Sequence, residues 1–99
     1  MIASVLEYGS TLSLRESNGN QIGIVGISSD SYLLGHSSTF LVVQNGNMIM
    51  TIDENSRTLG NVIHHGDYRV GGINENGFYV KTGSLTTQYD KYCNIVNKY

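Results

Sequence analysis

The chain has 99 residues, of which 39% are hydrophobic and only 14% are charged, and its formal net charge is −2. This length predicts a single domain over residues 1–99 with an adequate but modest core. The six basic residues are scattered and do not form the clustered positive face that phosphate binding requires, so direct nucleic-acid binding is disfavoured. The low charge density weakens repulsion between copies and therefore permits self-association.

Targeting and redox features are few. The first ten residues, MIASVLEYGS, lack a basic region and a long apolar core, so we expect no signal peptide. No run approaches the ~18 apolar residues of a membrane span. Cys93 is the only cysteine, so no intrachain disulfide can form, and we expect its thiol to be partly buried and inert. We expect a cytoplasmic protein, or one that is incorporated into an assembled particle.

The first third of the chain reads as strands and turns. The whole sequence has 12 Gly and 7 Tyr but no Pro or Trp, which favours strands and turns over helices. Three strands are expected here: residues 2–8, 11–15 and 21–27. The second places Leu12 and Leu14 on one face, and an Asn-Gly turn at 16–20 follows it. The glycines of the third indicate a bulge or a close backbone approach.

The middle of the chain carries the strongest local signal. After a polar corner at 28–31, a short apolar segment and a turn, two apolar segments at 40–43 and 48–53 flank Asn45-Gly46. This pattern predicts a β-hairpin with a type I′ turn. Residues 40–43 are apolar on both faces, which predicts a strand that is buried on both sides or meets a partner chain.

The last third is less uniform. Residues 57–65 fit a broken strand or a short helix, and Gly60 with the β-branched Val62 and Ile63 favours a strand. A further hairpin is expected from strands at 67–73 and 78–82 around a turn at 74–77. The apolar residues of 86–99 recur at spacings of 3, 4 and 7, which fits an amphipathic helix about as well as a final strand.

The Asn-Gly turns recur at spacings of 27 and 31 residues, which indicates either an internal repeat or three ordinary hairpins. In turn and strand spacing the pattern resembles the blades of a β-propeller, without the Trp-Asp and Gly-His signatures. We predict an all-β fold: a small single-domain antiparallel β-sandwich or partly open barrel of seven to nine strands built from hairpins. A short C-terminal helix is the main variation.

Candidate chemistry centres on His64, His65 and Asp67, whose side chains are zinc-ligand types. Neighbouring strand residues point to opposite faces, so both histidines could share a metal only if a turn bends the chain there; a solvated turn is the alternative interpretation. Ser37, His64 and Asp67 could form a hydrolytic site. Asp53 and Glu54 read as an exposed corner, and no phosphate-binding or dinucleotide motif occurs. We expect no cofactor and no catalytic constellation.

The tyrosines are more informative, because Tyr is enriched both at protein interfaces and in cross-strand packing. We predict a non-enzymatic protein–protein interaction module, in one of two forms. One is a self-assembling structural subunit of a viral particle or filament, and the other is a small inhibitor that occludes a host protein. The alternatives are a metal-dependent or hydrolytic protein and a carbohydrate-binding β domain. The residues predicted to make the interaction are Phe40, Val42, Tyr32, Tyr68, Tyr79 and Tyr89.

Overall fold

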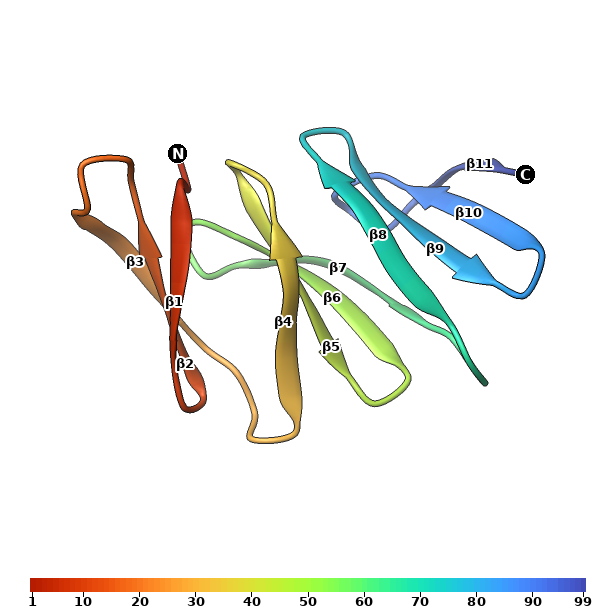
Figure 1. The fold of residues 1–99 in the computed structure, drawn as a ribbon, viewed down its shortest axis with the longest axis horizontal. Coiled ribbons are helices and arrows are strands. Elements are labelled where there is room, and N and C mark those ends of the chain that lie inside the picture. The colour runs from red at the N-terminus through yellow and green to blue at the C-terminus, as the bar shows by residue number, and fades with distance from the viewer.

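A computed structural model describes residues 1–99 as eleven antiparallel strands without any helix (Figure 1). The strands form three separate sheets that follow one another along the chain and along the long axis of the molecule. The all-β, hairpin-built fold class is therefore confirmed, as an open stack of sheets and not a closed barrel, but the strands number eleven where seven to nine were predicted. The structure contains no helix that is long and apolar enough to cross a membrane.

Each sheet is a simple meander, in which strands adjacent in sequence pair with one another. The first sheet contains β1 (Ser4–Tyr8), β2 (Thr11–Arg15) and β3 (Gln21–Gly26). The second contains β4 (Ser31–His36), β5 (Phe40–Asn45), β6 (Met48–Asp53) and β7 (Thr58–Ile63). The third contains β8 (Arg69–Asn74), β9 (Gly77–Thr82), β10 (Leu85–Tyr89) and β11 (Ile95–Lys98).

The three sheets repeat one backbone design every 37 residues. The tight hairpin turns carry positive φ at Gly9, Gly46 and Gly83, and the longer turns that follow carry positive φ at Gly19, Ser56 and Cys93. The register shifts beside those longer turns recur with the same spacing: after Leu14, Thr51 and Gln88. The chain therefore contains a structural repeat, in which β1, β5 and β9 are equivalent strands.

The Asn-Gly pairs do not mark this repeat. Asn18-Gly19 lies between β2 and β3, Asn45-Gly46 at the β5–β6 turn and Asn76-Gly77 between β8 and β9, so the three pairs occupy three different connections of the unit. The spacings of 27 and 31 residues are therefore not the period of the structure. What repeats is the backbone conformation, which Gly, Ser and Cys adopt at equivalent places.

The central hairpin forms as predicted, but its turn is different. Asn45 pairs with Met48 and ends β5, which leaves Gly46 and Asn47 as the two central residues. Only Gly46 has positive φ, at 58°, so the turn is not type I′; glycine at the first central position is the requirement of type II′. Both turn types match the twist of the strands, so the hairpin survives the change.

The C-terminal segment is two strands, and the helix does not form. Asp90 interrupts it: its backbone N–H donates to Asn94 O at 2.9 Å, and its carboxylate Oδ1 accepts the N–H groups of Tyr92 and Asn94. These bonds close a five-residue turn that aligns β11 with β10. The helical spacing of the apolar residues results from this turn and the bulge beside it, not from one face of a helix. Residues 58–63 are also a strand, as Val62 and Ile63 favoured.

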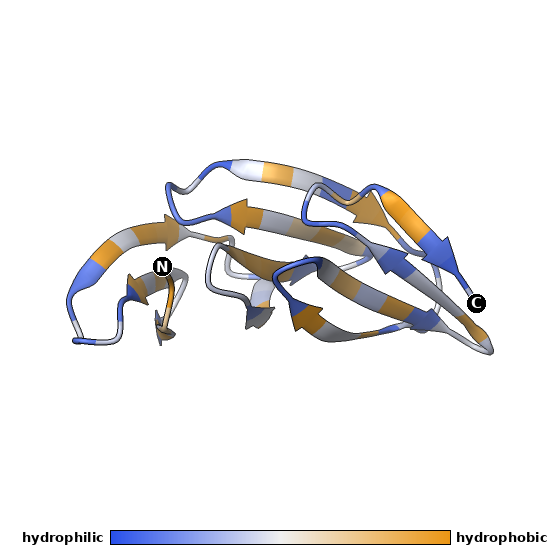
Figure 2. Ribbon diagram, turned by 90° about the horizontal axis from the view of Figure 1, so that it is seen from above, coloured by the Kyte–Doolittle hydropathy of each residue, from blue (hydrophilic) through white to orange (hydrophobic).

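Two apolar layers hold the stack together. The first lies between the first and second sheets, where Leu12 and Leu14 meet Leu41 and Val43. The second lies between the second and third sheets, where Phe40 and Val42 meet Phe78. The second sheet is thus buried on both faces, which explains why residues 40–43 are apolar throughout. Figure 2 shows the hydrophobic residues concentrated in the strands and the hydrophilic ones in the connecting loops.

Adjacent sheets also interlock through glycines. A Cβ added at Gly23 in β3 would lie 2.8 Å from Glu54 O, in the long turn of the next sheet. A Cβ at the equivalent Gly60 in β7 would overlap Tyr92 O, in the long turn of the third sheet. At the next equivalent position, in β11, the residue is Asn97, which no following turn covers. Glycine therefore occurs where another sheet packs and is replaced where the stack ends.

Candidate functional site

The predicted metal residues do not come together. His64 and His65 follow β7 in the loop to β8, where His65 and Asp67 are exposed and His64 is half-buried. No group of three His, Cys, Asp or Glu side chains in the chain is arranged to hold a metal ion. The structure therefore offers no geometry for the metal-dependent alternative.

His64 instead belongs to an aromatic cluster between the second and third sheets. Its Nε2 lies 3.0 Å from the Tyr89 hydroxyl, and its ring contacts Tyr68 and Tyr89 at centroid distances of 5.5 and 5.8 Å. Burial, and secondarily the neighbouring His65, lowers the pKa of His64 below its ordinary value of 6.5. The imidazole is thus a packing group, held by the Tyr89 hydroxyl and the two tyrosine rings.

The predicted interaction residues divide into two groups. Phe40, Val42 and Tyr89 are buried between the second and third sheets, with at most 4% of their surface exposed, so they pack the core of this chain. Tyr32 is 58% exposed, and the remaining two, Tyr68 and Tyr79, are half-buried. Only these last three tyrosines could reach a partner, so the apolar hairpin marks an internal interface between sheets.

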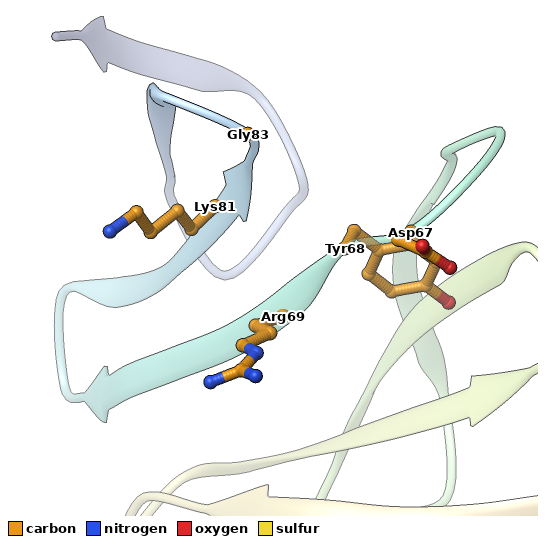
Figure 3. Close-up of a pocket in the computed structure, with 5 residues that line it drawn as sticks. All are labelled: Asp67, Tyr68, Arg69, Lys81 and Gly83. Carbon is orange, nitrogen blue, oxygen red and sulfur yellow. The ribbon is translucent and has the colours of Figure 1, made fainter.

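The structure has two shallow depressions. The larger, of about 500 Å³, lies at the third sheet and is lined by Asp67, Tyr68, Arg69, Lys81 and Gly83 (Figure 3). Arg69 and Lys81 are directly opposite on β8 and β9 and extend from neighbouring strands in the same direction, whereas Tyr68 donates its hydroxyl hydrogen to Gly46 O at 2.9 Å. The depression is open and polar, and it lacks the convergent apolar walls of a small-molecule pocket.

Cys93 is partly buried, as expected. Its thiol contacts the Thr51 hydroxyl at 3.6 Å, and burial is the main reason that its pKa is raised above the ordinary value. A thiol with a raised pKa is protonated at neutral pH and is a poor nucleophile. The residue joins the apolar layer between the second and third sheets, so its role in this structure is packing.

The clearest unpartnered surface is the outer face of the first sheet. Leu6 on β1 and Ile24 on β3 are both opposite Ser13 on β2, so the three side chains form one row across the sheet, and Tyr8 lies on the same face. Leu6, Tyr8 and Ile24 are 42%, 58% and 53% exposed. The sequence did not reveal this face, because the strand pattern alone cannot say which face meets another sheet.

The repeat shows that this face is unusual. The residues equivalent to Leu6 in the other two sheets are Val43 and Val80, and both are fully buried against the preceding sheet. The residues equivalent to Ile24 are Asn61 and Lys98, which are exposed and polar. Leu6 is thus exposed at a position that is apolar and buried in the other two sheets. Ile24 is apolar at a position that is polar in the other two sheets.

The opposite end of the stack mixes polar and apolar side chains. Val96 and Tyr99, at the repeat positions of Ile22 and Val25, are 57% and 61% exposed there. The outer face of the third sheet presents Thr86, Gln88 and Asn97, at the positions where the first sheet has Leu12, Leu14 and Gly23. Gln88 accepts a hydrogen bond from the Tyr99 hydroxyl at 3.2 Å on this face.

No protein-family model, curated protein or solved structure matches this chain. Its function is therefore inferred from the geometry of the chain alone.

Proposed function

We propose that this protein is a non-enzymatic, self-associating interaction module, and that two copies meet through the outer faces of their first sheets. One observation carries the proposal: Leu6 is 42% exposed at a repeat position where Val43 and Val80 are fully buried. Covering Leu6, Tyr8 and Ile24 removes apolar surface from water, which is the main favourable contribution to association.

Contact between the two first sheets would form a closed pair. Contact between identical faces produces a twofold dimer, whereas head-to-tail contact would produce rings or filaments. Head-to-tail contact would place the first sheet on the outer face of the third, where Thr86, Gln88 and Asn97 are polar and Val96 and Tyr99 are exposed. Of the self-assembling forms that the sequence predicts, we propose the compact structural subunit, and a mass above that of two chains would indicate the filament instead.

Light scattering after size exclusion, over a range of protein concentrations, tests this proposal. We expect the mass of two chains at high concentration, and the mass of one chain for the double variant Leu6→Lys, Ile24→Lys, because two buried cations oppose association. Ile63→Lys is the matched control, since Ile63 is 59% exposed on the second sheet and lies outside the proposed contact. A mass of one chain at every concentration would contradict the proposal and leave the inhibitor as the remaining form.

A further inference from the structure

Two like charges lie directly opposite each other in the third sheet. Arg69 on β8 pairs with Lys81 on β9, and both side chains are exposed. Like charges at such a position repel each other and destabilise a sheet, because the Cβ atoms of cross-strand partners are only about 5 Å apart. The sequence spaces its six basic residues apart, whereas the hairpin of β8 and β9 brings these two together.

The fold itself does not require this pair of cations. The repeat equivalents of Arg69 and Lys81 in the second sheet are Tyr32 and Gln44, which are opposite each other in the same way and carry no charge. Neutral side chains therefore form the same strand pairing at the same place in the repeat. Neither the packing nor the register of the third sheet explains why both residues are cationic.

No acidic group of the chain neutralises the pair. The only ion pair in the structure joins the amino group of Met1 to Glu54, at 3.5 Å. Asp67 lines the same depression as the two cations, but its carboxylate points away from the ends of Arg69 and Lys81 (Figure 3). Two positive charges thus lie side by side without a negative partner, in a chain whose net charge is −2.

A hydroxyl group extends the row of cations. Thr86 on β10 is opposite Lys81, so Arg69, Lys81 and Thr86 lie in one row on the same face of the sheet. Val80, which precedes Lys81, is buried in the apolar layer on the other face. Thr86 is half-buried, and its hydroxyl can donate a hydrogen bond. The row therefore combines two cationic donors with a neutral donor and contains no acidic group.

This part of a sheet stays open even where another sheet packs on the same face. Gln44 follows Val43, which belongs to the first apolar layer, so Gln44 and its partner Tyr32 lie on the side of the third sheet. Tyr32 is nevertheless 58% exposed. The exposure of Arg69, at the equivalent position, therefore does not depend on its sheet being the last one in the stack.

We propose that Arg69, Lys81 and Thr86 bind a phosphate group that carries two negative charges, at the depression of about 500 Å³ that the two cations line. The planar guanidinium of Arg69 can bind two oxygens of such a group, and the ammonium of Lys81 supplies a point charge. A tetrahedral oxyanion has enough oxygens for all three side chains, and its two charges balance the pair. The proposed dimer uses Leu6 and Ile24 of the first sheet, so the two proposals can fail separately.

A titration of isotope-labelled protein with sodium phosphate tests the proposal, at about pH 7.5 and at an ionic strength held constant with sodium chloride. The amide signals of Arg69, Lys81 and Thr86 should shift in a saturable way, and phosphate should raise the midpoint of thermal unfolding. Sodium acetate, which has one charge and two oxygens, should bind at least about tenfold more weakly. Shifts that do not saturate, or equal binding of acetate, would overturn the proposal.

Variants that remove one charge locate the site. Arg69→Gln and Lys81→Gln should each weaken phosphate binding by about tenfold or more, because each removes a charged donor. Lys98→Gln is the matched control: Lys98 is on the same sheet but is opposite the buried Thr87, so it lies on the other face and its loss should leave binding unchanged. An equal loss of binding in the control would overturn the assignment to this row.

Thermal unfolding without phosphate separates a binding role of Lys81 from a structural one. Lys81→Gln relieves the repulsion between opposed like charges and introduces the residue that the second sheet has at this position, so the midpoint in low salt should not decrease. Phosphate should then raise the midpoint of the unmodified protein more than that of the variant. A lower midpoint of Lys81→Gln without phosphate would show that the lysine serves the fold, and would overturn the proposal.

Methyl phosphate distinguishes the two sources of the phosphate group. It keeps three free oxygens and is a dianion near neutral pH, as a phosphorylated side chain is. Binding of both probes at Arg69, Lys81 and Thr86 would support a site that accepts phosphate esters, and binding of inorganic phosphate alone would support a site for the free ion. Absence of saturable binding of either probe would refute the proposal, whatever mass light scattering gives for the unmodified protein.

Discussion

At the scale of single residues, glycine positions record which surfaces of this protein are covered. Gly23 and Gly60 lie under the long turns of the following sheets, and neither has positive φ, so the reason for glycine there is space and not backbone conformation. Gly26, also in β3, has no heavy atom within 4 Å of an added Cβ. Gly23 and Gly60 are therefore needed for close packing, whereas Gly26 is not. Substitution by alanine should destabilise the protein at the first kind of position and not at the second.

Gly60→Ala should destabilise the protein by about 1–3 kcal/mol, because the methyl group overlaps the carbonyl oxygen of Tyr92 and the backbone must move. Gly26→Ala should change stability by no more than about 0.5 kcal/mol. Urea unfolding of both variants, followed by circular dichroism, measures the difference. Equal effects would show that the third sheet does not pack on β7 as described.

The second residue-scale prediction concerns pH. Burial lowers the pKa of His64 in the folded protein, so the unfolded chain binds its proton more readily. The stabilisation is therefore present above the ordinary pKa of about 6.5 and is lost as the pH falls through the lowered folded value. The midpoint of thermal unfolding should decrease between about pH 7.5 and about pH 5, within the range where histidine titrates.

His64→Gln should flatten this dependence, and His65→Gln should retain most of it, because burial of His64 is the main cause and His65 the lesser one. Thermal unfolding of the two variants across the same pH range checks the assignment. A slope that persists in His64→Gln would show that another group is responsible.

At the scale of elements, the long turns set the register of each sheet. In two of these turns an aspartate binds the backbone in the same way. Asp53 Oδ1 accepts the N–H groups of Asn55 and Arg57, and Asp90 Oδ1 accepts those of Tyr92 and Asn94. The first sheet reaches the same turn shape with Gly19 at the positive-φ position. Different side chains therefore produce one backbone conformation, which hides the repeat from direct inspection of the sequence.

Asp90→Ala should cost about 1–2 kcal/mol, since two backbone donors lose a charged acceptor at a turn that aligns β11. Asp90→Asn keeps an acceptor oxygen and should recover much of the loss. Asp30→Ala, at an exposed position outside these turns, is the control. Chemical denaturation supplies the free energies of unfolding, and an Asp90→Asn variant as unstable as Asp90→Ala would contradict the hydrogen-bond explanation.

At the scale of the whole molecule, the stack is asymmetric. Its principal extents are 40 × 26 × 18 Å, and the two apolar layers separate three sheets along the chain. One end presents Leu6, Tyr8 and Ile24 together with an open strand edge, and the other presents Thr86, Gln88 and Asn97 beside the exposed Val96 and Tyr99. Mass measurements on the Leu6→Lys, Ile24→Lys variant belong to this scale, because they test the end of the stack and not any one strand.

The sequence by itself determined the class of secondary structure. Alternating apolar residues in TLSLR, β-branched residues in 58–63 and glycine-containing turns are local signals, and local backbone preferences and strand periodicity are enough to read them. They predicted an all-β chain of hairpins and the central hairpin between β5 and β6. The apolar residues after residue 86 have the spacing of an amphipathic helix, but the segment forms two strands. A turn and a bulge between these strands produce the same spacing.

Only the tertiary structure decided which apolar faces meet. Phe40 and Val42 looked like a surface for a partner, but the third sheet covers them, whereas Leu6 and Ile24 lie on a face that no sheet of this chain covers. A strand pattern shows that a face is apolar and does not show what packs against it. That depends on contacts between residues distant in sequence, and the 37-residue repeat that organises those contacts is a repeat of backbone conformation more than of side chains.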